Sequence, residues 1–411
     1  MSAFVASRLS RQAPKRMLAL DGGGARGMIT VGFLEAVETL LRRRYKRDDY
    51  VLSDYFDMIG GTSVGSILAT MLALGWPMQK VREEFWKICP EIFSQRVGRG
   101  LILPRFSVRA LRRNLKNALG DMRLDSDALK TGLAIVSKRL DTGSAWVMYN
   151  NAHSEYWATR INAATGKKTV GNCEYRIADI IQASTAAPTY FRPHWIQIEA
   201  PSEGSAGQKG LFVDGGLSPY NNPSLLMFMM AGISGYRLGG VKEVTGDDGK
   251  TSKRGVPWEL GAQKLLIVSV GTGDYRVKVT SRRLTPAAGF GAQALLGTMA
   301  DNQATTLKLM QWLADPKRPW TINGEVDDLR WDNLGKLIGG SQALLSFTRY
   351  NIKLEEKWLR EKLNVTHFSD KRLARLRELD NPNELHTYLS LSRAAATFQV
   401  TDDDFPAEFD I

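Results

Sequence analysis

Short apolar runs that end in glycine-rich turns, each followed by a helical pattern, organise the first part of the chain. Residues 16–21 (RMLALD) form the first run, and apolar side chains at helical spacing follow its glycines as far as residue 41. Residues 55–61 (YFDMIGG) form the second run, and the apolar segment 66–74 (SILATMLAL) follows it. Repetition of strand, turn and helix is typical of α/β proteins. The pattern therefore predicts buried strands in a mainly parallel sheet that is covered by helices.

The middle of the chain continues this alternation and adds one antiparallel element. Residues 133–140 and 144–150 are separated by the tripeptide DTG, which predicts a β-hairpin. Residues 176–188 predict a helix that is stopped by its final proline. Residues 211–216 (LFVDGG) and 264–273 (KLLIVSVGTG) predict two further strands that end in glycine turns.

One helix, predicted over residues 106–120, is strongly two-sided. Ser107 is its expected N-cap, and one face is apolar at Val108, Leu111, Leu115 and Leu119. The opposite face carries a basic stripe, which consists of Arg109, Arg112, Arg113 and Lys116. Such a stripe is either an ordinary solvated helix face or a surface that contacts anionic lipid. The sequence leaves both interpretations open.

Composition and charge restrict the class of protein. The chain has 411 residues, of which 43% are hydrophobic, so a sizeable core is expected. Its two cysteines, Cys89 and Cys173, are far apart, which excludes a disulfide scaffold and a cysteine metal site. No apolar stretch is long enough to span a bilayer. The formal charge of +12 is compatible with anionic lipid, nucleic acid or another anionic ligand as a partner.

The segment 21–27 (DGGGARG) lies between a predicted strand and a predicted helix, and its glycines leave the backbone there without side chains. Its glycines fit the GxGxxG pattern of dinucleotide-binding proteins. Such proteins also need an acidic residue about 20 positions later at the end of a buried strand. Asp48 and Asp49 stand at that distance but follow the polar segment RRRYKR. The alternative is an oxyanion hole, in which backbone N–H groups stabilise the charge that develops on a tetrahedral intermediate.

An oxyanion hole needs a nucleophile, and the segment 61–65 (GTSVG) supplies one. In the GxSxG elbow the serine, here Ser63, occupies a tight turn between a strand and a helix that exposes its hydroxyl. The usual base is a histidine, and the order Ser–Asp–His would select His367 or His386. Both are flanked by polar, helix-like sequence that is typical of a surface position. The alternative interpretation is that Ser63 has no catalytic role and occupies a packed glycine turn.

Asp214 offers a different base. It ends an apolar run and enters a glycine turn, at the edge where catalytic side chains emerge from a parallel sheet. A free aspartate has a pKa of about 3.9, so complete proton transfer from a serine before attack would be very costly. The transfer must accompany the attack, and a strong oxyanion hole must supply much of the stabilisation. Taken alone, Asp214 is equally a turn-forming residue before two glycines.

The motifs DGGGARG, GTSVG and VDGG, in this order, resemble those of the patatin-like phospholipases. The blocks ASTAAPTYF (183–191), YNNPS (220–224) and SVGTG (269–273) agree with them. The resemblance spans about residues 16–274 and extends less clearly to FTRYNI (347–352). It implies a three-layer α/β/α fold with a mainly parallel central sheet. It also implies a serine lipid acyl hydrolase that uses a Ser-Asp dyad and needs no metal and no cofactor.

The resemblance also assigns roles to individual residues. Ser63 matches the nucleophile and Asp214 the base. The oxyanion loop comprises Gly22, Gly23, Gly24, Ala25, Arg26 and Gly27, and the amides of Gly23 and Gly24 are the expected donors. The glycines that support the two other motifs are Gly61, Gly65, Gly215 and Gly216.

The expected domain organisation is a flexible basic arm (1–15), a catalytic domain (16–350), a packed helical extension (351–400) and a mobile acidic tail (401–411). The expected substrates are fatty acyl esters of membrane phospholipids, cleaved by a cytoplasmic protein that is peripheral at the membrane when active. We expect no nucleic acid partner. The sequence leaves open whether the protein is a membrane-degrading effector that is switched on by an anionic activator such as a cyclic nucleotide. The alternative functions are a nucleotide-dependent oxidoreductase and a catalytically silent binding module.

Overall fold

The computed structural model describes residues 2–94, 105–161, 166–202, 205–245, 250–276, 287–316, 321–323, 328–330, 342–366 and 368–411. A mixed sheet forms its centre, in the order β12-β15-β11-β1-β2-β3-β8-β7-β6-β5, with β4 paired to β3. The parallel strands are β12 (Ala314–Pro316), β15 (Leu345–Tyr350), β11 (Leu265–Val270), β1 (Lys15–Leu20), β2 (Met58–Thr62) and β3 (Gly132–Arg139). The antiparallel strands are β4 (Ala145–Tyr149), β8 (Gln208–Asp214), β7 (His194–Glu199), β6 (Lys168–Thr169) and β5 (Arg160–Ile161).

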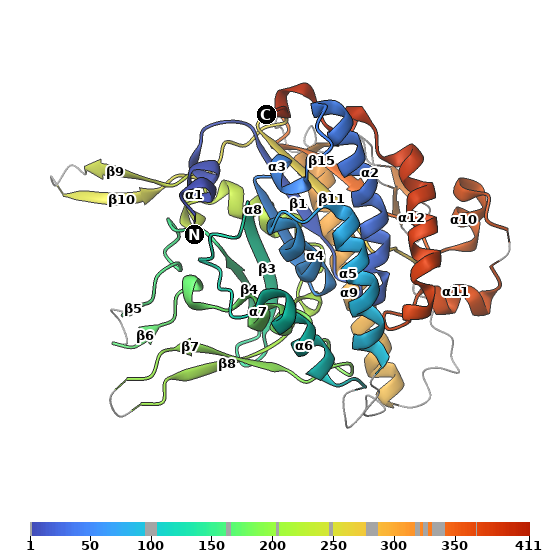
Figure 1. The fold of residues 1–411 in the computed structure, drawn as a ribbon, viewed down its shortest axis with the longest axis horizontal. Coiled ribbons are helices and arrows are strands. Elements are labelled where there is room, and N and C mark those ends of the chain that lie inside the picture. The colour runs from blue at the N-terminus through green and yellow to red at the C-terminus, as the bar shows by residue number, and fades with distance from the viewer. Residues whose placement is uncertain are drawn as a thin grey trace.

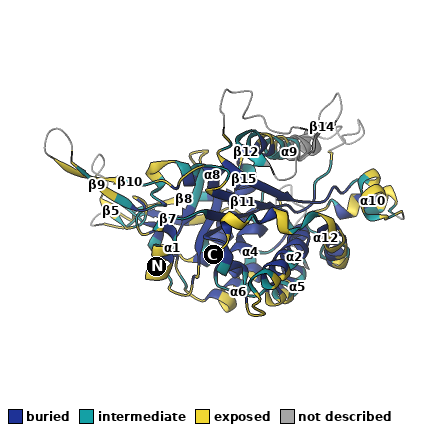
Figure 2. Ribbon diagram, turned by 90° about the horizontal axis from the view of Figure 1, so that it is seen from above, coloured by how far each residue is buried: buried dark blue, intermediate teal, exposed yellow. Residues whose placement is uncertain are grey.

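Helices cover both faces of the parallel strands and create three layers (Figure 2). One face carries α2 (Gly27–Tyr45), α4 (Val64–Ala73), α5 (Met78–Ser94) and α12 (Leu385–Gln399), and the other carries α8 (Ser224–Gly232) and α9 (Ala287–Leu313). Strands β1, β2 and β11 are buried along their whole length, as strands between two helical layers must be. The predicted α/β fold is confirmed, with a parallel centre and an antiparallel wing.

The remaining helices and strands complete the fold, and most of them are labelled in Figure 1. They are α1 (Ala3–Ser10), α3 (Leu52–Tyr55), α6 (Val108–Leu119), α7 (Ile177–Ser184), α10 (Glu356–Leu363), α11 (Asp370–Leu376), β9 (Val241–Thr245), β10 (Thr251–Gly255), β13 (Thr321–Asn323) and β14 (Asp328–Arg330). The two-sided helix predicted over residues 106–120 is α6, and the side chain of Ser107 caps it by accepting from the Arg109 amide. No described helix is long and apolar enough to cross a membrane.

The strand that ends at Asp214 is antiparallel to its neighbour β3, whereas the sequence predicts a parallel sheet at this point. β8 pairs with β3 in antiparallel fashion, so its assignment to a parallel sheet is wrong. The overlap covers only the end of β3, where Ser137 lies opposite Asp214. The end of β2 pairs with the same part of β3, through Thr62 and Val136. Asp214 therefore still reaches the edge of the sheet at which β2 ends.

The prediction of a flexible arm over residues 1–15 is wrong, because most of this segment is ordered structure. Helix α1 begins after Ser2, whose hydroxyl accepts a hydrogen bond from the Val5 amide. Val5 and Leu9, four residues apart on one face, are fully buried, and Lys15 already belongs to β1. Two apolar residues among basic ones form a pattern too short to predict a helix.

The prediction of a mobile acidic tail over residues 401–411 is also wrong. Phe405 and Phe409 are fully buried. The acidic residues of the tail form ion pairs with the basic end of α2, through the pairs Arg43–Asp402 and Arg44–Asp410. Two aromatic anchors and complementary charge therefore hold the chain end against the domain.

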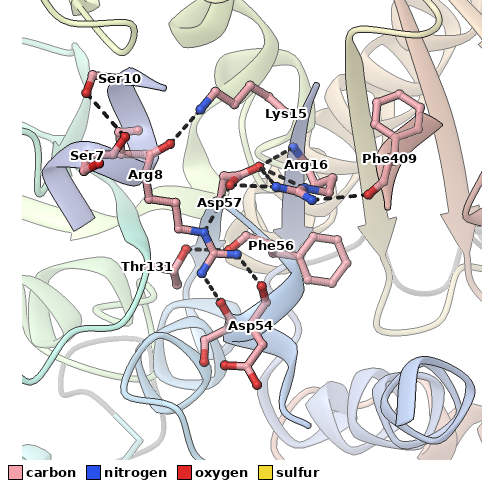
Figure 3. A network of polar contacts seen from close by, with 12 residues as sticks. Ser7, Arg8, Ser10, Lys15, Arg16, Asp54, Phe56, Asp57, Thr131 and Phe409 are labelled. Atoms are coloured by element: carbon pink, nitrogen blue, oxygen red, sulfur yellow. Dashed lines mark hydrogen bonds and ion pairs between the residues drawn. The ribbon is translucent and has the colours of Figure 1, made fainter. Parts of the chain in front are cut away.

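A buried ionic network joins both chain ends to the start of the sheet (Figure 3). Asp57, the residue before β2, accepts hydrogen bonds from the Arg16 guanidinium at 3.0 Å and from Arg8 Nε at 3.1 Å. Arg16 also donates to the carbonyl of Phe409, and Lys15 donates to the carbonyl of Arg8. The carboxylate of Asp57 is thus shared by two arginines, which hold α1 and the tail in place.

Replacement of Asp57 by asparagine is expected to lower the free energy of unfolding by about 3–5 kcal/mol, because it leaves two buried guanidinium groups without their counter-ion. Equilibrium denaturation in urea measures this loss. The matched control is Asp49→Asn, which breaks an exposed pair with Arg47. The control is expected to leave stability nearly unchanged, because an ion pair exposed to water contributes little. Equal losses in the two variants would contradict a special role for the network.

Candidate active site

Ser63 forms the turn between β2 and α4. Its backbone adopts φ 53° and ψ −126°, a conformation that residues other than glycine rarely adopt. The glycines on either side allow the turn: a Cβ on Gly61 would lie 2.1 Å from the Gly65 carbonyl oxygen, and one on Gly65 would lie 2.3 Å from the Leu20 carbonyl oxygen. The Ser63 amide donates to the hydroxyl of Ser184 at 2.9 Å. The strand, strained turn and helix expected of a nucleophile elbow are therefore present.

Asp214 lies in direct contact with this serine. The Ser63 hydroxyl donates to Oδ2 of Asp214 at 2.6 Å, and the amide of Gly216 donates to Oδ1 at 2.7 Å. Only 5% of Asp214 is exposed. Burial raises the pKa of its carboxyl to about 6, and the hydrogen bonds from Ser63 and Gly216 offset this effect only in part. A carboxylate with a pKa near neutrality is better matched to accepting a proton than a free aspartate is.

The glycine loop is held by hydrogen bonds on both sides. The Gly22 amide donates to the Asn221 carbonyl at 3.2 Å, and the Ala25 amide donates to the Leu379 carbonyl at 2.7 Å. Among the described residues, the structure gives the amides of Gly23 and Gly24, which lie between these anchors, no hydrogen-bond acceptor. These are the two amides expected from the sequence to be the oxyanion donors.

Thr272, from the SVGTG segment, orients one of these amides. Its hydroxyl donates to the Gly22 carbonyl at 2.9 Å. No described peptide bond is cis, and in a trans peptide the carbonyl and the following N–H point in opposite directions. The Gly23 N–H therefore points away from Thr272. Sequence reasoning missed Thr272 and Asn221 as supporting residues, although both lie in blocks that it had singled out.

Asp21 and Arg26, the charged residues of the DGGGARG segment, are placed differently. Asp21 forms a buried ion pair with Arg349 of β15 at 2.5 Å. It therefore anchors the end of β1 inside the sheet. Arg26 is 8% exposed, and its guanidinium lies 5.5 Å from the centroid of the Tyr275 ring. It lines the cavity beside Ser63, where Nε and Nη1 have no hydrogen-bond partner among the described residues.

A cavity of about 290 Å³ opens beside the serine. Ser63, Asp214 and the glycine loop form one side of it. Its other walls are largely apolar and include Val64, Ile67, Phe85, Ile88, Ile92 and Leu111. Apolar walls next to a nucleophile suit the hydrocarbon part of an ester.

The histidines do not form a triad with Ser63 in the part of the chain that the structure describes. No described histidine lines the cavity. His386 is exposed, and its ring packs edge-on against Trp86. His367 lies outside the described residues.

The basic stripe of α6 is exposed, as its spacing predicted. Arg109, Arg112, Arg113 and Lys116 all lie on the solvent side of the helix. Arg112 donates to Gln182, and Arg113 forms an ion pair with Glu91. The structure therefore shows that the stripe is accessible, but part of its charge already has a partner.

Comparison with known proteins agrees with this geometry. A family model of patatin-like phospholipase matches residues 18–227, about half of the chain. A cGAMP-activated phospholipase of Escherichia coli is 28% identical over 70% of this chain and 72% of its own length. A cGAMP-activated phospholipase of Vibrio cholerae is 29% identical over 70% of this chain and 74% of its own. Patatin-17 of Solanum cardiophyllum is 30% identical over 62% and 60%.

The matched segment begins in β1 and ends in α8, so it includes the glycine loop, the serine elbow and Asp214. Asp48 and Asp49, by contrast, lie in an exposed turn rather than at the end of a buried strand. The requirement of the dinucleotide-binding alternative is therefore not met. The chain belongs to the patatin-like phospholipase family of carboxylic ester hydrolases.

Proposed function

We propose that this protein hydrolyses fatty acyl esters of membrane phospholipids through a Ser63–Asp214 dyad. The observation that carries the proposal is the 2.6 Å hydrogen bond between the Ser63 hydroxyl and the buried Asp214 carboxylate. This pair faces an apolar cavity that suits an acyl chain. The glycine loop beside it offers two backbone donors for an oxyanion.

The reaction proceeds in two steps that use the same groups. Asp214 accepts the hydroxyl proton as Ser63 Oγ attacks the ester carbon, and the amides of Gly23 and Gly24 stabilise the oxyanion. Asp214 then passes the proton to the leaving alkoxide, which leaves an acyl-enzyme. Water attacks the acyl group and gives its proton to Asp214. Collapse of the second intermediate releases the fatty acid and restores the proton to Ser63.

We infer that the protein acts as a signal-activated effector at the membrane surface. Its similarity to two cGAMP-activated phospholipases supports an anionic activator of the cyclic nucleotide class. The formal charge of +12 favours an approach to anionic lipid from the cytoplasm.

Mass spectrometry of the products from mixed phospholipid vesicles, with and without cGAMP, tests both parts of this proposal. We expect free fatty acid and lysophospholipid to appear, and the rate to rise when cGAMP is added. The same assay with Ser63→Ala gives the background. Product formation that is independent of cGAMP would contradict this activator while leaving the hydrolase intact. Absence of product under all conditions would contradict the hydrolase.

Reversal of charge on the basic stripe is expected to slow hydrolysis of anionic vesicles by about tenfold or more, since each basic residue near such a surface contributes about 1 kcal/mol. Arg109→Glu/Lys116→Glu is the preferred variant, because Arg112 and Arg113 hold neighbouring side chains. Hydrolysis of a soluble short-chain ester should not change.

The control for the stripe is Lys357→Glu/Lys371→Glu, which makes the same charge change on exposed positions of α10 and α11. It should retain vesicle hydrolysis. If the stripe variant loses hydrolysis of both the vesicles and the soluble ester, the stripe supports the structure of the active site. No loss on either substrate would make it an ordinary solvated face.

A further inference from the structure

The loop between α11 and α12 brings the C-terminal part of the chain into the wall of the cavity. Leu379 of this loop lines the cavity together with Gly22, Gly23 and Gly24. It lies far outside the segment that matches the family, which ends at residue 227. Figure 1 shows α11 and α12 on the outer side of α2, the helix that begins at the glycine loop. The C-terminal extension therefore contributes to the site itself.

The contact between this loop and the glycine loop is made by backbone atoms. The Leu379 carbonyl accepts from the Ala25 amide at 2.7 Å. Gly24, with φ +58°, approaches the same carbonyl so closely that a Cβ on it would lie 2.1 Å from the oxygen. The Asn221 carbonyl accepts from the Gly22 amide at the other end of the glycine loop, so the carbonyls of Asn221 and Leu379 flank it on either side. The amides of Gly23 and Gly24 lie between them.

An ion pair fixes the loop that carries this anchor. Asp380, whose side chain is 8% exposed, accepts from Arg105 at 3.2 Å. The Arg105 guanidinium lies 5.0 Å from the centroid of the Tyr190 ring, and the Arg105 amide donates to the Thr189 carbonyl. Arg105, Thr189, Tyr190 and Leu379 all line the cavity. Through the ion pair and these two further contacts, Arg105 connects three separate segments of the cavity wall.

The extension has other attachments that do not reach the glycine loop. Arg393 of α12 forms an ion pair with Glu35 of α2 at 2.7 Å. These two residues lie outside the cavity that contains Ser63. If the extension only packed against the domain, breaking the Arg393–Glu35 pair and breaking the Arg105–Asp380 pair would have the same effect on turnover. If it orients the oxyanion donors, only the second pair would affect the chemical step.

We propose that Leu379 and Asp380 are positioning residues for the oxyanion loop. The Arg105–Asp380 pair fixes the loop, and the Leu379 carbonyl then fixes Ala25, which directs the Gly23 and Gly24 amides toward the carbonyl oxygen of the ester. This role rests on the proposed hydrolysis by Ser63 and Asp214. It gives the C-terminal extension a means to alter turnover without touching the substrate.

The test is steady-state hydrolysis of a soluble p-nitrophenyl ester by the full chain carrying Asp380→Ala. Small displacements of oxyanion donors affect the transition state more than the ground state. We therefore expect kcat to fall by about tenfold or more, while KM stays within about twofold. Arg105→Gln, which removes the other partner, should lower kcat similarly. The double variant should lose no more than either single variant, because both changes break one interaction.

The control Arg393→Gln should keep both kcat and KM, and thermal unfolding should show all variants folded. Unchanged kcat in Asp380→Ala, or an equal loss in Arg393→Gln, would overturn the positioning role. If Asp380→Ala does not fold, Arg105→Gln decides alone by the same criterion. Ser63→Ala separates the two levels of the proposal. If Ser63→Ala keeps its activity, the dyad is overturned. If Ser63→Ala is inactive but Asp380→Ala has the kcat of the wild type, only the positioning role is overturned.

Discussion

The variant Ser63→Ala is expected to lose roughly 10⁴-fold or more of its ester hydrolysis, because it lacks the atom that attacks the substrate. The fold should survive, since the backbone contacts of Ser63 do not use its hydroxyl. Its amide still donates to Ser184, and its carbonyl still accepts from Ser66. Alanine is no more strained than serine at φ 53°. Release of p-nitrophenol from a short-chain ester, with thermal unfolding as the check on folding, measures the effect.

A fluorophosphonate provides an independent measurement of the same residue. It reacts with an activated serine, so mass spectrometry of the labelled protein should find the adduct on Ser63. The Ser63→Ala variant should remain unlabelled. An adduct on another serine, or full activity of the alanine variant, would exclude Ser63 as the nucleophile.

The sequence predicted this site well wherever the chemistry depends on a local pattern. The segment GTSVG requires glycines on both sides of a strained residue, and Gly61 and Gly65 indeed have no room for a side chain. Asp214 stands 151 residues from Ser63, so no local pattern could establish their contact. The resemblance to the patatin-like phospholipases implied that pairing, and the structure adds the geometry.

Residues that support the site through long-range backbone contacts could not be found in this way. The carbonyls of Asn221 and Leu379 hold the glycine loop, but a carbonyl is present at every position and leaves no mark in the sequence. Thr272 acts through a hydroxyl, and the sequence showed only that it stands in a glycine turn after a strand. Such contacts depend on which segments the fold brings together.

The two errors at the chain ends have a common cause. The charge of each terminal segment, basic at the start and acidic at the end, predicts a solvated and mobile segment. The anchors are few and apolar: Val5 and Leu9 in α1, and Phe405 and Phe409 in the tail. The two residues of each pair are four positions apart, and a single such spacing is too short to predict a buried face. Burial of each aromatic or aliphatic side chain nevertheless contributes about 1.5–3 kcal/mol to stability. The opposite charges of α2 and the tail then add to this anchoring.

The variant Asp214→Asn is expected to lose nearly as much activity as Ser63→Ala, because members of one catalytic unit do not contribute independently. Asparagine has the same shape, and its side-chain oxygen can still accept from Gly216, but it cannot take a proton from Ser63. The matched control is His386→Ala, an exposed residue that should leave turnover nearly unchanged. A folded but inactive His386→Ala together with an active Asp214→Asn would favour a histidine triad.

Stability and pH distinguish this catalytic role from a structural one. Burial raises the pKa of Asp214 from its ordinary value near 3.8 to about 6, so the rate should rise with pH through about 6 and level off above it.

A carboxyl with a raised pKa stabilises the fold in its protonated form, and this contribution is lost as pH increases through 6. Ionised Asp214 therefore costs the folded state about 3 kcal/mol at pH 8. Asp214→Asn avoids this cost, so at pH 8 it should unfold at the same temperature as the wild type or higher, despite its inactivity. A markedly lower unfolding temperature, or a wild-type rate that is flat between about pH 5 and 8, would contradict Asp214 as the base.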